Sequence, residues 1–325
     1  MSWLSILALS LQAAVGFQAA SYALAATGLN VHFGYTGLSN FGHAGFLLVG
    51  AYGMGIAADQ GWGLGAGLAL GIGAAVVLGL LLGIPTLRLR GDYLAVVTIA
   101  AAEILRLVAN ARPSEPLTGG SHGITGLSAR LGFFDHNVVP SGTYGVGDSF
   151  LFSSRQLWAM LWCWGLVAVA TLVVHLLARS PWGRVLKAIR EDEDAARALG
   201  KNVVAYKLQS FVLGGLFGAL AGAMIVLEAG NVSAGTWVAT LTFALYTVVI
   251  LGGTGTVLGP VVGAAVYWFI LRLVEGILTN LWFDIDSSTV GAVRLALMGV
   301  GLMLLMIFRP QGILGSRKEM LADAR

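Results

Sequence analysis

One charged stretch organises this chain: ARSPWGRVLKAIREDEDAARALGKNVVAYK, residues 178–207. It is the one long, strongly charged interval between hydrophobic segments, and it holds seven of the 19 lysine and arginine residues. Ser180 and Pro181 suit a helix start, because proline's fixed φ fits the first turn and its missing N–H costs nothing there. Gly200 suits a helix end. The stretch therefore predicts a water-facing helix between these two points.

This predicted helix carries a narrow apolar stripe along an otherwise charged surface. Val185, Leu186, Ile189, Ala196 and Leu199 recur at roughly helical spacing. Such a stripe needs something to pack against, and we expect a protein partner. The residues expected to serve that contact are Arg184, Arg190, Glu191, Asp194, Ala195, Ala196 and Gly200. The alternative is a solvated amphipathic loop with no partner.

Composition identifies the class of protein. Hydrophobic residues make up 57% of the 325, charged residues 11%, and the mean hydropathy is +0.82. A soluble domain of this size could not carry that composition without very large exposed apolar patches, so the chain is a polytopic membrane protein. The net charge of +3 is too small to indicate a nucleic-acid partner. Cys163 is the single cysteine, which excludes an intramolecular disulfide.

The chain is predicted to be all-α, with about nine membrane-spanning helices in a single transmembrane domain, residues 1–325. About 20 apolar residues cross a bilayer core, and only helices or closed barrels satisfy the backbone there. By that criterion the candidate spans are residues 3–28, 40–58, 63–84, 93–110, 157–178, 207–228, 236–252, 257–280 and 290–308. Eight or ten crossings stay open, because the second and seventh spans are candidates for re-entrant segments.

Basic residues orient these spans, since short cytoplasmic loops are enriched in lysine and arginine. The loop with Arg88 and Arg90, the segment 179–207 and the basic tail are expected in the cytoplasm. The loop of residues 111–156 is then expected outside, with irregular structure and one short hairpin or helix. These assignments predict an outer amino terminus, read as a retained first span, and a cytoplasmic carboxyl terminus.

A glycine-rich stretch, FGYTGLSNFGHAGFLLVGAYGMG at residues 33–55, indicates a broken or closely packed helix at membrane depth. Non-helical backbone at that depth is tolerated only against protein or a water-filled cavity. Asn40, His43 and Tyr52 are therefore candidates to line a substrate pathway. The other interpretation is a packing face in which His43 bonds a neighbour.

Further candidates lie within and just after the predicted fourth span. Glu103 and Arg106 are three residues apart on one helix face, where each lowers the cost of the other's charge. Glu103 is a candidate pathway residue, although structural pairing near the outer interface explains both residues equally well. Thr118, Gly119 and Gly120 offer unhindered backbone N–H groups that either bind a carboxylate or shape the loop.

The run GGTGTVLGPVVGAA from Gly252 interrupts the hydrophobic sequence without matching a nucleotide-binding loop, which needs a lysine before Ser or Thr. We expect a tight turn between helices or a cytoplasmic gate there. Arg272 and Glu275 form a further pair three residues apart. The five histidines are dispersed, and no catalytic motif or metal-ligand spacing is present in the sequence, so an enzyme is not expected.

Taken together, these stretches resemble the LivM-type permease of branched-chain amino acid ABC importers. The resemblance includes Asp194-Ala195-Ala196 followed by Gly200, which is similar to the EAA-x-x-x-G coupling signature of importer permeases, with aspartate for glutamate. It also covers the runs from Gly37, Arg88, Leu117, Gly252 and Phe308, in the family's order and over most of the chain.

The resemblance implies a location in the inner (plasma) membrane of a bacterial cell, a set of partners and a mechanism. A solute-binding protein outside the membrane would deliver the solute to this chain and a homologous, LivH-like second permease. Two cytoplasmic ATPase subunits would bind ATP and Mg²⁺, with no cofactor on this chain, and their motion would pass through the segment near Arg184 to Gly200.

The solute and the transport class leave alternatives. Leucine, isoleucine and valine are the expected solutes, while a urea or short-amide ABC permease and a permease for other neutral amino acids fit the same motifs. An ion-coupled secondary transporter is the rival of a different class, because broken helices and buried ionisable groups occur there too. Against it, the intramembrane charges are paired near the interfaces.

Overall fold

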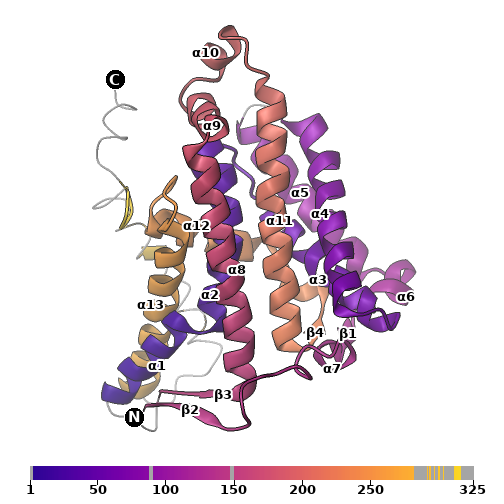
Figure 1. Ribbon diagram of the computed structural model, residues 1–325, viewed down its shortest axis with the longest axis vertical. Helices are drawn as coiled ribbons and strands as arrows, with labels where there is room; N and C mark the ends of the chain where they lie inside the picture. The colour runs from indigo at the N-terminus through magenta and orange to yellow at the C-terminus, as the bar shows by residue number, and fades with distance from the viewer. Residues whose placement is uncertain are drawn as a thin grey trace.

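The computed structural model describes residues 3–87, 91–146, 150–281 and 311–315, with isolated positions between 291 and 303. Long helices run side by side along one axis (Figure 1). In chain order the long helices are α1 (Trp3–Val15), α2 (Phe17–Asn30), α3 (His43–Asp59), α4 (Leu64–Thr86), α5 (Gly91–Asn110), α8 (Ser154–Arg179), α11 (Val203–Ala229), α12 (Ala239–Gly252) and α13 (Gly259–Leu281).

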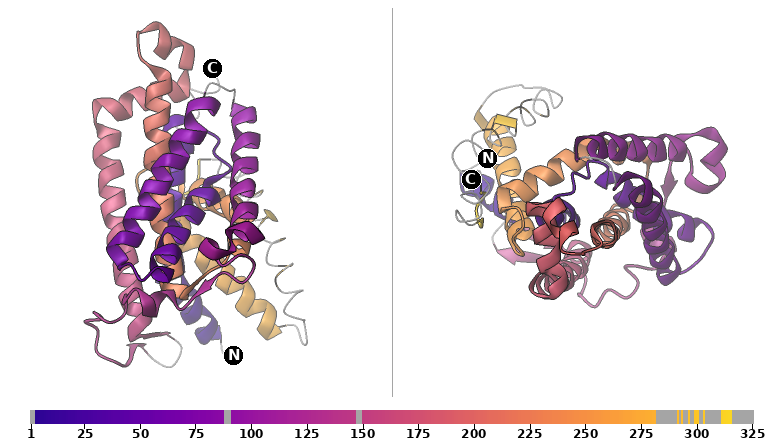
Figure 2. Two further views of the ribbon diagram at one scale, coloured as in Figure 1. Left: turned by 90° about the vertical axis from the view of Figure 1, so that its right-hand side faces the viewer. Right: turned by 90° about the horizontal axis from the view of Figure 1, so that it is seen from above.

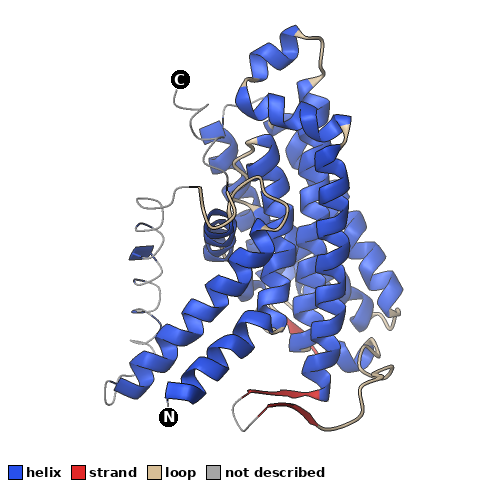
Figure 3. Ribbon diagram, turned by 60° about the vertical axis from the view of Figure 1, so that its left-hand side comes forward, coloured by secondary structure: helices blue, strands red, loops and turns tan. Residues whose placement is uncertain are grey.

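Short elements connect these helices. The short helices are η1 (Val31–Tyr35), η2 (Arg112–Ser114), α6 (Glu115–Thr118), α7 (Leu127–Arg130), α9 (Pro181–Glu191), α10 (Glu193–Ala198) and η3 (Ala234–Thr236). The strands are β1 (Ile124–Thr125), β2 (Thr143–Val146), β3 (Phe150–Ser153) and β4 (Asn231–Val232). β2 and β3 form an antiparallel hairpin, and β1 pairs antiparallel with β4. The expected hairpin in the long loop is therefore present (Figure 3).

The two ends of the bundle are built differently. The α9–α10 pair projects from one end, and the β2–β3 hairpin lies at the other, close to the amino terminus (Figure 1). α8 runs from the hairpin to α9, and α11 returns from α10 toward the hairpin end. Seen along the bundle axis, α9 and α10 lie over these two helices (Figure 2).

Glycine and alanine let α2, α3 and α11 form the centre of the bundle. A Cβ at Gly50 would lie 2.0 Å from the carbonyl oxygen of Ala219, and one at Gly222 would lie 2.0 Å from that of Leu47. A Cβ at Gly28 would lie 2.3 Å from the carbonyl oxygen of Gly214. Small residues permit such close backbone approach between helices in lipid, where dispersion contacts replace the hydrophobic effect between helices.

The predicted all-α polytopic class is confirmed, but the expected nine spans exceed what the described residues provide. Five helical segments are long and apolar enough to cross a membrane, or six if α5 and the bent segment after it form one span. Two of the predicted spans, 40–58 and 236–252, correspond to α3 and α12. These helices have 17 and 14 residues, fewer than the roughly 20 that cross a bilayer core. Most of the predicted span at 290–308 lies outside the described residues, as do Arg88, Arg90 and the basic tail beyond residue 315.

Two predicted helices are interrupted. The first span breaks at Gly16, where extended backbone separates α1 from α2, and α1 packs along α13. The single helix predicted between Pro181 and Gly200 is instead two helices. It breaks at Asp192, whose backbone is extended at φ −151° and whose side chain accepts a hydrogen bond from the Ala195 amide. Aspartate is favoured at such a cap because its carboxylate satisfies an amide that has no partner within the helix.

Candidate coupling segment and translocation site

Helix α9 starts and α10 ends as the sequence predicts. The Ser180 hydroxyl accepts a hydrogen bond from the Gly183 amide, with Pro181 in the first turn. Gly200 follows α10 with φ +76°, a left-handed conformation that favours glycine. The α9–α10 pair is thus bounded by a local cap at its start and a left-handed glycine at its end.

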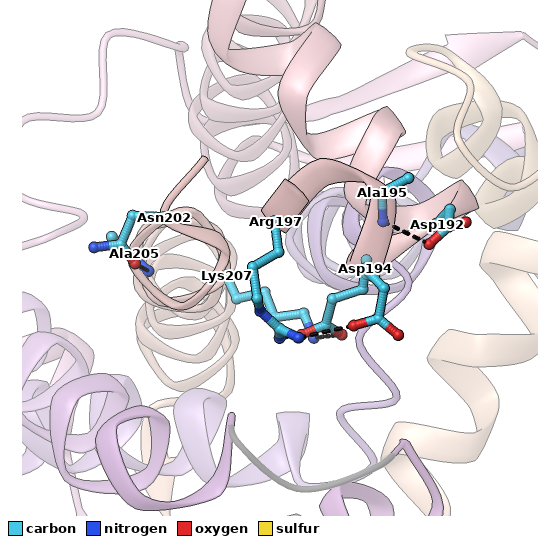
Figure 4. Close-up of polar contacts among 8 residues, drawn as sticks. Asp192, Asp194, Ala195, Arg197, Asn202, Ala205 and Lys207 are labelled. Atoms are coloured by element: carbon cyan, nitrogen blue, oxygen red, sulfur yellow. Dashed lines mark hydrogen bonds and ion pairs between the residues drawn. The ribbon is translucent and has the colours of Figure 1, made fainter. Parts of the chain in front are cut away.

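Ion pairs stabilise α10 internally and tie it to α11. Arg197 donates to Asp194 Oδ1 at 2.8 Å and to Glu193 Oε1 at 2.9 Å. Lys207, at the beginning of α11, donates to the other oxygen of Glu193. Figure 4 shows Arg197, Asp194 and Lys207 converging beneath α10, with the Asp192 cap alongside. These contacts orient a short helix that would be marginal alone.

The predicted partner-facing residues divide between a surface and a small core. Ala196 is 3% exposed and packs with Ile189 and Val203, so it supports the segment from within. The exposed members are Arg184, Arg190, Glu191, Asp194, Ala195 and Gly200, together with Leu199 at 79% exposure. A projecting, mixed-charge surface with one exposed leucine is suited to docking against another protein.

The interruption after α2 lies inside the bundle, as the glycine-rich stretch predicts. Residues 37–42 are not helical, and α3 begins at His43. Side chains from other helices satisfy the amides at this start: Thr98 accepts from the Phe41 amide at 3.1 Å and Thr242 accepts from the Ala44 amide at 2.9 Å. The Ala44 amide lies in the first turn of α3, where amides have no partner within the helix, and the Phe41 amide belongs to the break, so the two threonines stabilise the interruption.

Asn40 and His43, two predicted pathway residues, belong to a buried polar network. The Asn40 amide donates to His32 Nδ1 at 3.1 Å, and His32 Nε2 bonds the Phe211 carbonyl oxygen at 2.9 Å. His43 Nε2 bonds the Ala25 carbonyl oxygen at 3.0 Å, while its Nδ1 has no hydrogen-bond partner among the described residues. Both histidine rings also pack against glycines of α11.

The remaining predicted pathway residues lie apart from this network. Tyr52 is buried on α3. Glu103 forms the predicted pair with Arg106, through two parallel hydrogen bonds. Thr118 donates to the Ala109 carbonyl oxygen, and the Gly119 and Gly120 amides donate within the loop. Loop shaping therefore accounts for the contacts of Thr118, Gly119 and Gly120.

Two cavities lie elsewhere, lined by helices and the hairpin end. One, of about 370 Å³, is lined partly by Gln12, Gln18, Gln156, Glu228, Trp268 and Arg272. The second, of about 280 Å³, is almost wholly apolar and includes Trp158, Trp162 and Leu220. None of the predicted pathway residues lines either cavity.

The turn at Gly252–Gly255 connects α12 to α13, as predicted. It contacts the end of α2, just before the break between α2 and α3. Asn30, the last residue of α2, accepts from the Gly255 amide at 2.9 Å and donates to the Thr256 carbonyl oxygen at 2.8 Å. A Cβ at Gly34 would lie 2.4 Å from the Gly255 nitrogen. Asn30 is not among the residues predicted from the sequence, although a lone asparagine in an apolar helix is a signal of such a contact.

Interrupted helices packed around buried glycines, with a charged helical pair at one end, define a polytopic helical membrane protein. Residues 12–308 match the model of the family described as branched-chain amino acid transport system / permease component. The chain belongs to this family.

Individual relatives agree with that assignment. The chain is 32% identical over 241 residues to the high-affinity branched-chain amino acid transport system permease protein LivM of Salmonella typhimurium, covering 72% of this chain and 53% of the relative. It is 28% identical over 238 residues to the probable LivM permease of Methanocaldococcus jannaschii, covering 71% of this chain and 62% of the relative. The chain thus spans about half the length of the first of these relatives and less than two thirds of the second.

A solved structure, PsaBC from Streptococcus pneumoniae in complex with Fab, is similar to this chain at 15% sequence identity. The superposition has a TM-score of 0.43 and covers 97% of this chain and 95% of that one.

Proposed function

We propose that this chain is the membrane-spanning permease subunit of an ABC importer for branched-chain or other neutral amino acids. A binding protein delivers the solute, a homologous LivH-like permease completes the pathway, and two ATPase subunits hold the ATP and Mg²⁺. The chain itself hydrolyses nothing. It lies in the inner membrane, with its amino terminus outside and its carboxyl terminus in the cytoplasm.

The observation that carries this proposal is the projecting α9–α10 pair. It lies between the membrane spans α8 and α11 as a compact, charged unit held by its own caps and ion pairs. A loop that only connected α8 to α11 would need no such rigidity. Family membership supports the same role, because the coupling signature lies in α10 and the turn after it.

The proposed route for force is from the ATPase to α10, then through α9 into the bundle. Arg184, Glu191, Asp194, Ala195 and Gly200 lie exposed on this unit and provide the docking surface. Ala196 holds the two short helices together from inside. Binding energy at the tip is useful only if the unit moves as one body, which the Glu193 contacts to Arg197 and Lys207 favour.

Uptake measurements test the proposed transport class. Labelled leucine uptake is followed in cells that express this chain with its neighbouring genes, with ATP depletion and a proton ionophore applied separately while ATP is monitored. Loss on ATP depletion, with persistence under ionophore, is expected. Loss under ionophore while ATP holds would contradict the ABC mechanism and favour an ion-coupled transporter.

Competition then identifies the solute class. Excess unlabelled valine is expected to suppress leucine uptake, and alanine to suppress it if the range of neutral amino acids is broad. Suppression by urea, without suppression by valine, would overturn the amino-acid assignment in favour of a urea or short-amide permease.

A further inference from the structure

The Arg190 side chain extends from α9 to η1 at the end of α2, and does not only face a partner. Its Nη1 donates to the carbonyl oxygen of Gly34 at 2.5 Å, across 156 residues of chain. A Cβ at Gly37 would lie 3.3 Å from Arg190 Cγ, and one at Gly255 would lie 2.9 Å from Nη1. The side chain therefore lies along three glycines, where larger residues would obstruct it.

The Gly34 carbonyl lies at the end of the π-helical turn η1, which continues α2. The last carbonyls of a helix have no partner within the helix, and the negative end of the helix dipole attracts a cation. Residues of the break and α11 serve the preceding carbonyls: the Thr36 and Ser210 hydroxyls donate to Val31, the Leu38 amide to His32 and the Gly37 amide to Phe33. Arg190 supplies the bond to Gly34, so α9 caps the end of the first span.

Hydrogen bonds extend from this helix end to the turn between α12 and α13. Asn30 holds the turn between α12 and α13 through Gly255 and Thr256. The end of α12 is also bonded to the segment 311–315, whose Ile313 and Leu314 amides donate to Leu251 and Gly252. One continuous set of contacts therefore joins α9, the break after α2, the α12–α13 turn and the segment 311–315.

We propose that Arg190 is a positioning residue that transmits movement of the α9–α10 unit to the break between α2 and α3 and to the turn between α12 and α13. The proposal rests on the proposed function, in which ATPase subunits move that unit. A charged guanidinium bonded to a carbonyl is directional, so displacement of α9 must either carry Gly34 with it or break the bond. Because Asn30 ties the same helix end to the α12–α13 turn, the break after α2 and this turn shift together.

The test measures coupling in the assembled complex. Arg190→Gln, Arg190→Lys and the matched control Lys201→Gln are compared in proteoliposomes with ATPase subunits, partner permease and loaded binding protein. Lys201 is exposed in the turn after α10, so its variant removes the same charge from the same end of the molecule. The quantity followed is labelled leucine moved per ATP hydrolysed.

Arg190→Gln is expected to lower leucine moved per ATP about tenfold, within the range found for residues that connect two sites. Arg190→Lys, which keeps the charge without the guanidinium geometry, is expected to give an intermediate loss, and Lys201→Gln a wild-type ratio. A wild-type ratio for Arg190→Gln would overturn the proposal, as would an equal loss for Lys201→Gln.

A second measurement is independent of transport. Hydrogen exchange of the purified full chain in detergent is expected to quicken at residues 31–42 and 253–258 in Arg190→Gln, with α4 unchanged. Unchanged exchange at both segments would overturn the positioning role. If exchange quickens but the wild-type complex moves no leucine with ATP, the proposed function fails while the structural link stands.

Discussion

Lys207 and Glu193 form an ion pair that ties the beginning of α11 to the start of α10, across 14 residues of chain. The Lys207 side chain is 10% exposed and that of Glu193 is 38% exposed, so the pair is partly shielded from water. It fixes the projecting tip to a membrane-spanning helix.

We expect this pair to contribute more than the exposed pair beside it. A double-mutant cycle of Glu193→Ala and Lys207→Ala is predicted to give a coupling energy of about 1 kcal/mol, since partial shielding preserves more of the attraction. The cycle of Asp194→Ala and Arg197→Ala is the control, because those side chains are 91% and 58% exposed. Thermal unfolding in detergent measures both, and equal coupling energies would show that shielding has no effect here.

The two alanines of the coupling signature should respond differently to the same substitution. Ala195→Arg, at an exposed position, is expected to leave the unfolding midpoint unchanged and to weaken capture of the ATPase roughly fivefold or more. Ala196→Arg forces a charge against Ile189 and Val203 and is expected to cost about 1–3 kcal/mol of stability. Pull-down and thermal unfolding distinguish them. Wild-type capture by Ala195→Arg would remove α10 from the docking surface.

Close helix packing predicts which glycines are required. Gly50→Ala and Gly222→Ala place a Cβ 2.0 Å from a carbonyl oxygen of a facing helix, and each is expected to cost about 1–3 kcal/mol. Gly73→Ala, with no heavy atom within 4 Å of the added Cβ, is the matched control. It should be neutral, or more stable by roughly 0.5–1 kcal/mol through helix propensity. Unfolding midpoints that do not separate the two classes would contradict the packing.

The buried histidine network should be non-additive. His32→Ala leaves the Asn40 amide and the Phe211 carbonyl oxygen unpaired in the core, which costs about 1–3 kcal/mol. Adding Asn40→Ala should cost less than it does in the wild-type background, because its partner is already missing. The exposed His122→Ala should stay within about 0.5 kcal/mol of wild type. Strict additivity of the two core variants would contradict the network.

The sequence predicts most helix positions because long apolar runs leave few alternatives in lipid. The span expected at 207–228 is α11 at Val203–Ala229, and the one expected at 157–178 is α8 at Ser154–Arg179. Local caps were equally readable at Ser180 and Gly200. The breaks at Gly16 and Asp192 were missed, because a helical hydrophobic pattern continues across both positions and only the backbone reveals the interruption.

Side-chain direction at the candidate site was the least predictable feature. Ala196 and Leu199 belong to the same apolar stripe, yet one is buried and the other exposed, because the break at Asp192 turns α10 relative to α9. Arg190 looks like part of a charged surface, and its contact with Gly34 depends on a helix end 156 residues away. Such long-range contacts are not encoded in local spacing.

We propose that ATP hydrolysis on partner subunits drives amino-acid movement through this chain. The most direct test of this proposal is labelled leucine uptake into proteoliposomes that hold this chain, the partner permease and both ATPase subunits, with ATP inside and loaded binding protein outside. Uptake that requires hydrolysable ATP and disappears when this chain is omitted is predicted. Equal uptake with a non-hydrolysable ATP analogue, or without this chain, would contradict the account.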